Sequence, residues 1–179
     1  MKNCIYMDLE VQTSGDEVGG FTMEATRQRK MSVAVTFKPQ TLTLKVYLEP
    51  EVNQLVEELK KADQVIGYNL NEFDLVVLSG YPGIDVSGIK TLDLMEAVRE
   101  AAQRRYSLDD LVMGTFGSDS SVSGHDLIKL WKNGEREAVI HACCDDVLNM
   151  WRLHQHGIKH GQLSGVTKRQ SQFEAKWTL

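Results

Sequence analysis

The predicted fold is organised around the stretch Cys4-Ile5-Tyr6-Met7-Asp8-Leu9-Glu10-Val11. Its residues 5–7 form a short apolar run, typical of a strand that is buried on both faces. Asp8 and Glu10 follow at a spacing of two, so an extended backbone directs both carboxylates to the same side. Two such groups repel each other and are costly to remove from water unless a cation lies between them. The pattern indicates a site for a hard divalent metal, and two solvated acids at a strand end are the alternative.

Size and composition limit the class of protein. The chain has 179 residues, of which 42% are hydrophobic and 25% are charged, as in a single globular domain with a real core. It has no apolar run near the roughly 20 residues that span a bilayer, no signal-peptide pattern and only three cysteines. We therefore expect a reducing, cytoplasmic location and no membrane partner. The net charge of −5 argues against a large footprint on duplex nucleic acid, but not against an enzyme that grips a strand end.

The hydrophobic pattern predicts an α/β fold with a mixed five-stranded sheet flanked by helices. Residues 12–26 are polar and glycine-containing, which predicts a loop. Residues 31–37 and 41–47 alternate in hydrophobicity and form a predicted antiparallel hairpin, which makes a three-stranded meander with the first strand. The later predicted elements are a helix over 51–61, strands over 64–67 and 89–93, and helices over 72–78, 94–103, 108–113, 126–131 and 135–156. We expect residues 1–158 to form the domain, and 159–179 a polar tail that is part of it or loosely attached.

More acids follow later in the chain. Asp74 comes after the predicted strand 64–67, near a helix start. A carboxylate at that position also stabilises a helix by about 0.3–1 kcal/mol through its interaction with the helix dipole. Asn69, at the end of that strand, also suits a turn. Asp145 and Asp146 lie beside the apolar stripe of the predicted helix 135–156, and His141 precedes them on the same helix.

This ordered set resembles the DEDD (DnaQ-like) superfamily of 3′–5′ exonucleases, which has a ribonuclease H-like fold, and in detail the group with a histidine general base (DEDDh). The resemblance runs from about Cys4 to Leu153. Three motifs carry it in order: Asp8-x-Glu10, Asn69-x-x-x-Phe73-Asp74 and His141-x-x-x-x-Asp146. Three further stretches are similar to bacterial predicted exonucleases of this fold: Val65-Ile-Gly-Tyr-Asn69, Tyr106-Ser-Leu-Asp-Asp-Leu111 and Leu130-Trp-Lys-Asn-Gly134.

The resemblance implies a function and a set of site residues. It implies hydrolysis of phosphodiester bonds at the 3′ end of single-stranded DNA or RNA, which releases nucleoside 5′-monophosphates by a two-metal mechanism with Mg²⁺ or Mn²⁺. His141 would be the base that activates water. The metal-binding carboxylates that it implies are Asp8, Glu10, Asp74 and Asp146, and the substrate-binding residues are Val11, Thr13, Asn69 and Phe73.

Two features of the third motif leave alternatives open. Relatives that use a tyrosine place it four residues before the last aspartate, where this chain has Ala142, so a tyrosine mechanism is excluded. On an ideal helix residues four apart are nearly aligned, whereas residues five apart are separated by about 140°. Helix geometry therefore pairs His141 with Asp145, and the family spacing pairs it with Asp146. We choose Asp146 as the metal ligand and keep Asp145 as the alternative. The alternative function is an inactive exonuclease-like module that binds nucleic acid or docks a partner.

Overall fold

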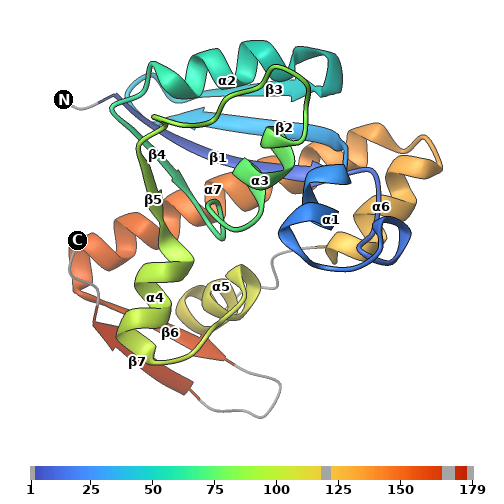
Figure 1. Ribbon diagram of the computed structural model, residues 1–179. Coiled ribbons are helices and arrows are strands. Elements are labelled where there is room, and N and C mark those ends of the chain that lie inside the picture. Colours follow the sequence, from blue (N-terminus) through green and yellow to red (C-terminus); the bar gives the residue numbers. More distant parts are fainter. Residues whose placement is uncertain (1–2, 118–121, 167–171, 177–179) are drawn as a thin grey trace.

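A five-stranded mixed sheet forms the centre of the computed structural model, which describes residues 3–117, 122–166 and 172–176 (Figure 1). The strand order is β3-β2-β1-β4-β5. β1 (Cys4–Val11), β2 (Met31–Lys38) and β3 (Thr43–Leu48) form the predicted antiparallel meander, and β4 (Gln64–Gly67) and β5 (Thr91–Asp93) continue the sheet in parallel with β1. The predicted α/β fold with a mixed five-stranded sheet flanked by helices is confirmed.

β1 lies between two hydrophobic cores because its alternate side chains point to opposite faces of the sheet. Ile5 and Met7 are fully buried in one core, and Tyr6 is buried in the other. This strand is therefore apolar on both sides until Asp8, as a central strand of a covered sheet must be. Between Glu10 and Val11 the pairing with β2 shifts register, so the end of the strand is irregular at the point where the acids lie.

Helices cover both faces of the sheet (Figure 1). Four side chains at helical spacing on α2 (Val52–Lys60) pack in the core of Ile5 and Met7: Val52, Leu55, Val56 and Leu59. On the other face, α7 (Arg136–His160) packs in the core of Tyr6 through Val139, Cys143, Val147 and Met150. The remaining helices are α1 (Met23–Gln28), α3 (Asp74–Ser79), α4 (Leu94–Ala102), α5 (Leu108–Phe116), α6 (Gly124–Lys132) and the 3₁₀ turns η1 (Asp16–Val18) and η2 (Glu49–Glu51). No helix in the described part of the chain is long and apolar enough to cross a membrane.

The segment predicted as a loop over 12–26 contains η1 and the start of α1, which is a correction. Thr22 caps α1, since its side chain accepts a hydrogen bond from the Ala25 N–H. α1 docks on α3 at Gly80, where a Cβ would lie only 1.8 Å from the Arg27 carbonyl oxygen. The helix has few apolar residues, so its periodicity was too weak to predict it; the close contact at Gly80 positions it instead.

The segment expected to be a polar tail also has regular structure. α7 continues to His160, and β6 (Gln162–Val166) pairs antiparallel with β7 (Gln172–Lys176). Leu163 of β6 is 1% exposed and belongs to the same core as α7. The Thr115 hydroxyl donates to the Ser164 carbonyl at 3.0 Å and accepts from the Ser164 N–H at 3.2 Å. β6 is therefore fixed to α5, and the described part of this segment is not loosely attached.

Candidate active site

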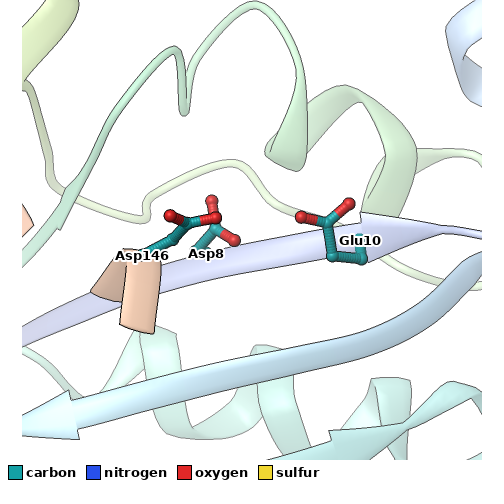
Figure 2. A group of neighbouring side chains, drawn as sticks. All are labelled: Asp8, Glu10 and Asp146. Carbon is teal, nitrogen blue, oxygen red and sulfur yellow. The ribbon is translucent and has the colours of Figure 1, made fainter. Parts of the chain in front are cut away.

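Three carboxylates from two elements meet at the end of β1 (Figure 2). Asp8 and Glu10 project from β1, and Asp146 projects toward them from α7. Each residue offers a carboxylate oxygen, and these oxygens all lie within 4.8 Å of one another. We call Asp8, Glu10 and Asp146 the carboxylate cluster. The spacing of two in Asp8-x-Glu10 and the packing of α7 against β1 together bring these groups to one place.

The burial of α7 decides between Asp145 and Asp146. Cys143 and Val147 face the core, and Asp146 lies next to them, half-buried. Asp145 is exposed. His141 is also exposed and is not part of the carboxylate cluster. α7 is a continuous helix from Arg136, so His141 points about 140° away from Asp146. The structure brings Asp146 to the other acids and leaves His141 apart from them.

Asp74 lies against β1 but is held differently from the cluster. It begins α3, its side chain is 3% exposed, and its Oδ1 accepts a hydrogen bond from the Leu9 N–H at 3.1 Å. Leu9 separates the two acids of β1 in the sequence, so this bond holds Asp74 beside them. All four carboxylates expected to bind metal therefore lie around the end of β1.

Burial raises the pKa of all four acids, and repulsion by neighbouring carboxylates adds to the rise for Glu10, Asp74 and Asp146. Burial raises the pKa of Asp8 to about 7, although a hydrogen bond from Cys143 opposes the rise. Burial and the charge of Asp8 raise the pKa of Asp146 to about 8. The same two causes raise the pKa of Glu10 and of Asp74 well above the ordinary values. In the absence of a cation the site therefore retains protons near neutral pH.

The donor groups fit divalent ions. Asp146 Oδ1 is buried and has no hydrogen-bond partner in the described part of the protein. The Cys143 thiol donates to Asp8 Oδ2 at 3.4 Å, which orients that carboxylate, and burial raises the pKa of the thiol so that it stays protonated. A buried, unpaired carboxylate oxygen beside two further acids is the arrangement that a hard cation such as Mg²⁺ or Mn²⁺ satisfies.

A cavity of about 420 Å³ opens beside the acids. Asp8, Glu10 and Asp74 line it, and so do Val11 and Phe73, two of the residues expected to bind substrate. A smaller adjoining cavity of about 190 Å³ shares acids with the first and adds Asp146 to its wall. Thr13 and Asn69 line neither cavity.

Comparisons with known proteins identify the family. A family profile described as RNase_H superfamily matches residues 5–157, which include β1, α3 and the part of α7 that carries Asp146. The chain belongs to the RNase_H superfamily. Membership supports a nuclease, a hydrolase that acts on nucleic acid with the help of divalent metal.

A solved structure confirms the fold of this RNase_H-superfamily chain. The family B DNA polymerase of the hyperthermophilic archaeon Pyrobaculum calidifontis is similar with a TM-score of 0.66 and 17% sequence identity. The match covers 88% of this chain and 25% of the polymerase, so the chain spans a quarter of that protein's length. At this identity the likeness establishes the fold alone. A search of curated proteins found no match.

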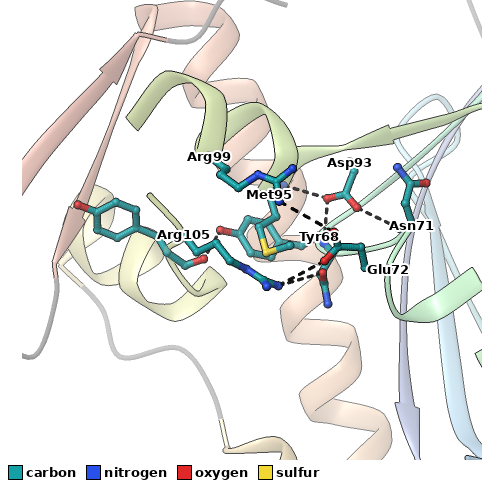
Figure 3. A network of polar contacts seen from close by, with 9 residues as sticks. Tyr68, Asn71, Glu72, Asp93, Met95, Arg99 and Arg105 are labelled. Atoms are coloured by element: carbon teal, nitrogen blue, oxygen red, sulfur yellow. Dashed lines mark hydrogen bonds and ion pairs between the residues drawn. The ribbon is translucent and has the colours of Figure 1, made fainter. Parts of the chain in front are cut away.

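A polar network that includes Asp93 and Asn71 (Figure 3) holds a loop of this RNase_H-superfamily chain in place, and Asn69 belongs to it. The Asn69 backbone N–H donates to Asp93 Oδ1 at 2.9 Å, and the Asn71 N–H donates to Asp93 Oδ2 at 3.0 Å. Asp93 also caps α4, since its Oδ1 accepts from the Met95 N–H. The Asn69 side chain accepts from Arg105 at 3.2 Å. These bonds fix the turn that connects β4 to α3, and thereby the placement of Asp74.

Several residues of the cavity wall were not predicted from the sequence. Phe21, Arg29 and His125 line the larger cavity, and Tyr68 lines both. Phe21 and Arg29 flank α1, whose presence the sequence did not indicate. Tyr68 stood within the stretch that resembles exonucleases, and its hydroxyl donates to the Tyr106 carbonyl at 2.7 Å. His125 lay in a glycine- and serine-rich segment without periodicity, where no pattern distinguished it.

Proposed function

We propose that this protein is a divalent-metal-dependent 3′–5′ exonuclease that removes nucleoside 5′-monophosphates from the 3′ end of single-stranded DNA or RNA. The observation that carries the proposal is the carboxylate cluster, in which acids from two distant parts of the sequence meet within 4.8 Å. The order of the motifs supports the 3′–5′ exonuclease group, and membership in the RNase_H superfamily supports a nuclease.

Asp8, Glu10 and Asp146, together with Asp74, would hold two ions, either Mg²⁺ or Mn²⁺. When bound, such a pair polarises the phosphate, activates water and stabilises the leaving oxygen. Cys143 orients Asp8 for this task through its thiol hydrogen bond. Asp74 is oriented by the Leu9 N–H. Val11 and Phe73 would contact the terminal nucleoside, because both line the cavity beside the acids.

The proton acceptor for the attacking water has two candidates. His141 has the family spacing relative to Asp146, but it lies outside the walls of both cavities. His125, in the first turn of α6, lines the same cavity as Asp8 and Glu10. A proton acceptor must come within hydrogen-bond reach of the water, either directly or through a second water. The position of His125 therefore favours it as the acceptor in this fold.

A cleavage assay with a pair of adjacent variants tests the proposal. With Mn²⁺ or Mg²⁺, 5′-labelled single-stranded oligonucleotides should give a ladder that shortens from the 3′ end, with nucleoside 5′-monophosphates as products. Asp146→Asn should slow release at least about 100-fold, because it removes a ligand of the ions. Asp145→Asn is the matched control, since Asp145 is exposed and outside the carboxylate cluster.

Each other result contradicts part of the proposal. Oligonucleotides that bind but stay intact with both metals would indicate an inactive binding module. Internal products in place of a ladder would indicate an endonuclease. An equal loss of nucleotide release in Asp146→Asn and Asp145→Asn would contradict the assignment of Asp146 as a metal ligand.

A further inference from the structure

Arg29 is a cation in a cavity wall that also carries several carboxylates and an apolar surface. The larger cavity is lined by four carboxylates, namely Asp8, Glu10, Asp16 and Asp74, and Arg29 is the only lysine or arginine among its described lining residues. The apolar part of the same wall consists of Val11, Phe21, Phe73 and Ile128.

The Nε of the Arg29 guanidinium is buried and has no hydrogen-bond partner among the residues that the structure describes. The residue is only 9% exposed, and its guanidinium lies over the Phe73 ring, 5.3 Å from the ring centroid. The negative charge of Glu17 attracts the Arg29 guanidinium. Glu17 is itself paired with Lys132, however, and accepts a hydrogen bond from the Ser14 N–H. A buried donor without a partner destabilises a fold, and native proteins rarely keep one without a reason. Arg29 also lines the cavity, so a ligand there that carries acceptor atoms would bind the terminal amino groups of the same guanidinium.

The lining favours a flat, neutral ligand. Phe21 is 81% exposed, yet its ring rests on the backbone of Gly15, where a Cβ would meet ring carbons at 2.6 Å. Phe21 and Phe73 therefore present aromatic rings to the same cavity, as in sites that stack nucleobases. A phosphate group bound at Arg29, in addition to the phosphate that is cleaved, would add negative charge beside four carboxylates. A nucleobase would add no charge. The edge of a base also offers in-plane acceptors, which match the planar fork of an arginine.

We propose that Arg29 reads the base of the 3′-terminal nucleotide and makes the site prefer guanine to adenine. Guanine offers two adjacent acceptors, O6 and N7, to one guanidinium, whereas adenine places an amino donor beside its N7. This inference rests on the proposed exonuclease function, because it places the terminal nucleotide in the cavity next to the carboxylate cluster.

Two measurements test the inference separately from the proposed function. The first is the rate of release of the terminal nucleotide from oligonucleotides that differ only in a 3′-terminal G, A, C or T. We expect kcat/KM for a terminal G to exceed that for a terminal A by at least about fivefold, and Arg29→Lys to remove this preference because lysine lacks the fork. Arg27→Gln is the control, since Arg27 is exposed and does not line the cavity.

The second measurement does not need turnover. Calorimetric binding of guanosine and adenosine 5′-monophosphates, with Mn²⁺ present, should show tighter binding of the guanosine nucleotide to the wild type and to Arg27→Gln, but not to Arg29→Lys. Thermal unfolding of each variant confirms that it is folded, and Arg29→Gln serves if the lysine variant is not.

The outcomes separate the two claims. Cleavage at equal rates for all four ends, together with equal binding of both nucleotides, would overturn the inference and leave the exonuclease function intact. Absence of cleavage would overturn the proposed function, and the binding data alone would then decide the role of Arg29. A preference for ends that carry a 3′-phosphate, lost in Arg29→Lys, would show that Arg29 binds phosphate and would overturn the assignment to a base.

Discussion

Adjacent residues on α7 differ in burial because one rotation of about 100° separates core-facing from solvent-facing positions. Asp146 lies beside Cys143 and Val147 on the core-facing side, and Asp145 lies in solvent. The apolar stripe alone could not make this choice, since both aspartates flank it, and in the sequence only the family spacing favoured Asp146. The register of α7 against β1 is what decides it, and that register is a property of packing.

The first prediction at this scale concerns the two histidines. We expect His125→Ala to slow nucleotide release by about 10²–10⁴-fold, the usual contribution of a general base, and His141→Ala to change it much less. The reason is that His125 lines the cavity beside Asp8 and Glu10, whereas His141 does not. Single-turnover rates at saturating Mn²⁺ measure the effect. The reverse order would show that α7 rearranges when substrate binds, so that the family spacing prevails.

The second prediction concerns the neighbouring cysteines. Cys143→Ala removes the thiol that donates to Asp8, so we expect weaker Mn²⁺ binding, by about 10–100-fold, as for other groups that orient a metal ligand. Cys143→Ser, which restores a donor, should recover part of the loss. Cys144→Ala is the control, because Cys144 is only half-buried and does not belong to the carboxylate cluster. Titration of Mn²⁺ followed by calorimetry gives the affinities, and unchanged affinity in Cys143→Ala would remove this role.

At the scale of elements, sequence patterns predicted those that bury many apolar residues. The bounds of β4 were predicted without error, and those of β2 and α2 to within one residue, since β-branched alternation and helical periodicity are strong there. α1 and the pair β6–β7 were not predicted. Their positions depend partly on close backbone contacts, Gly80 against Arg27 and Gly114 against β6, which leave no periodic pattern in the sequence.

The third prediction tests one of these contacts. A Cβ at Gly114 would lie 2.4 Å from the Ser164 carbonyl oxygen, so Gly114→Ala must push β6 away from α5. We expect a loss of about 1–3 kcal/mol in the free energy of unfolding, as in other overpacked sites. Gly124→Ala is the control, because nothing lies within 4 Å of its added methyl group and its φ is not positive. Urea unfolding curves give both values; stability equal to the wild type would mean that β6 is not closely packed on α5.

For the whole molecule, the sequence predicted a set of acids for one site but not how burial together would change their pKa values. Asp8-x-Glu10 and Asp74 could be recognised because their spacing follows strands and helix starts. The raised pKa values arise only when folding buries these groups together with Asp146. The folded protein thus concentrates like charges at one end of β1, and this opposes folding wherever the groups are ionised.

The last prediction follows from that opposition. In the unfolded chain these carboxyls titrate near pH 4, whereas Asp8 and Asp146 in the folded state titrate near 7 and 8. Between these values the folded state holds more protons, so the metal-free protein should lose stability as the pH rises from about 4 to about 8. Asp146→Asn should raise the free energy of unfolding at pH 8 by at least about 1 kcal/mol and change it little at pH 4.

Mn²⁺ at 100 times its dissociation constant should stabilise the wild type at pH 8 by about 2.7 kcal/mol, because it binds only the folded site. Thermal unfolding across pH, with and without Mn²⁺, measures all three effects, and Asp145→Asn should behave as the wild type. A stability profile that is flat from pH 4 to 8 without metal would mean that the acids are not buried together, and the proposed metal site would fail with it.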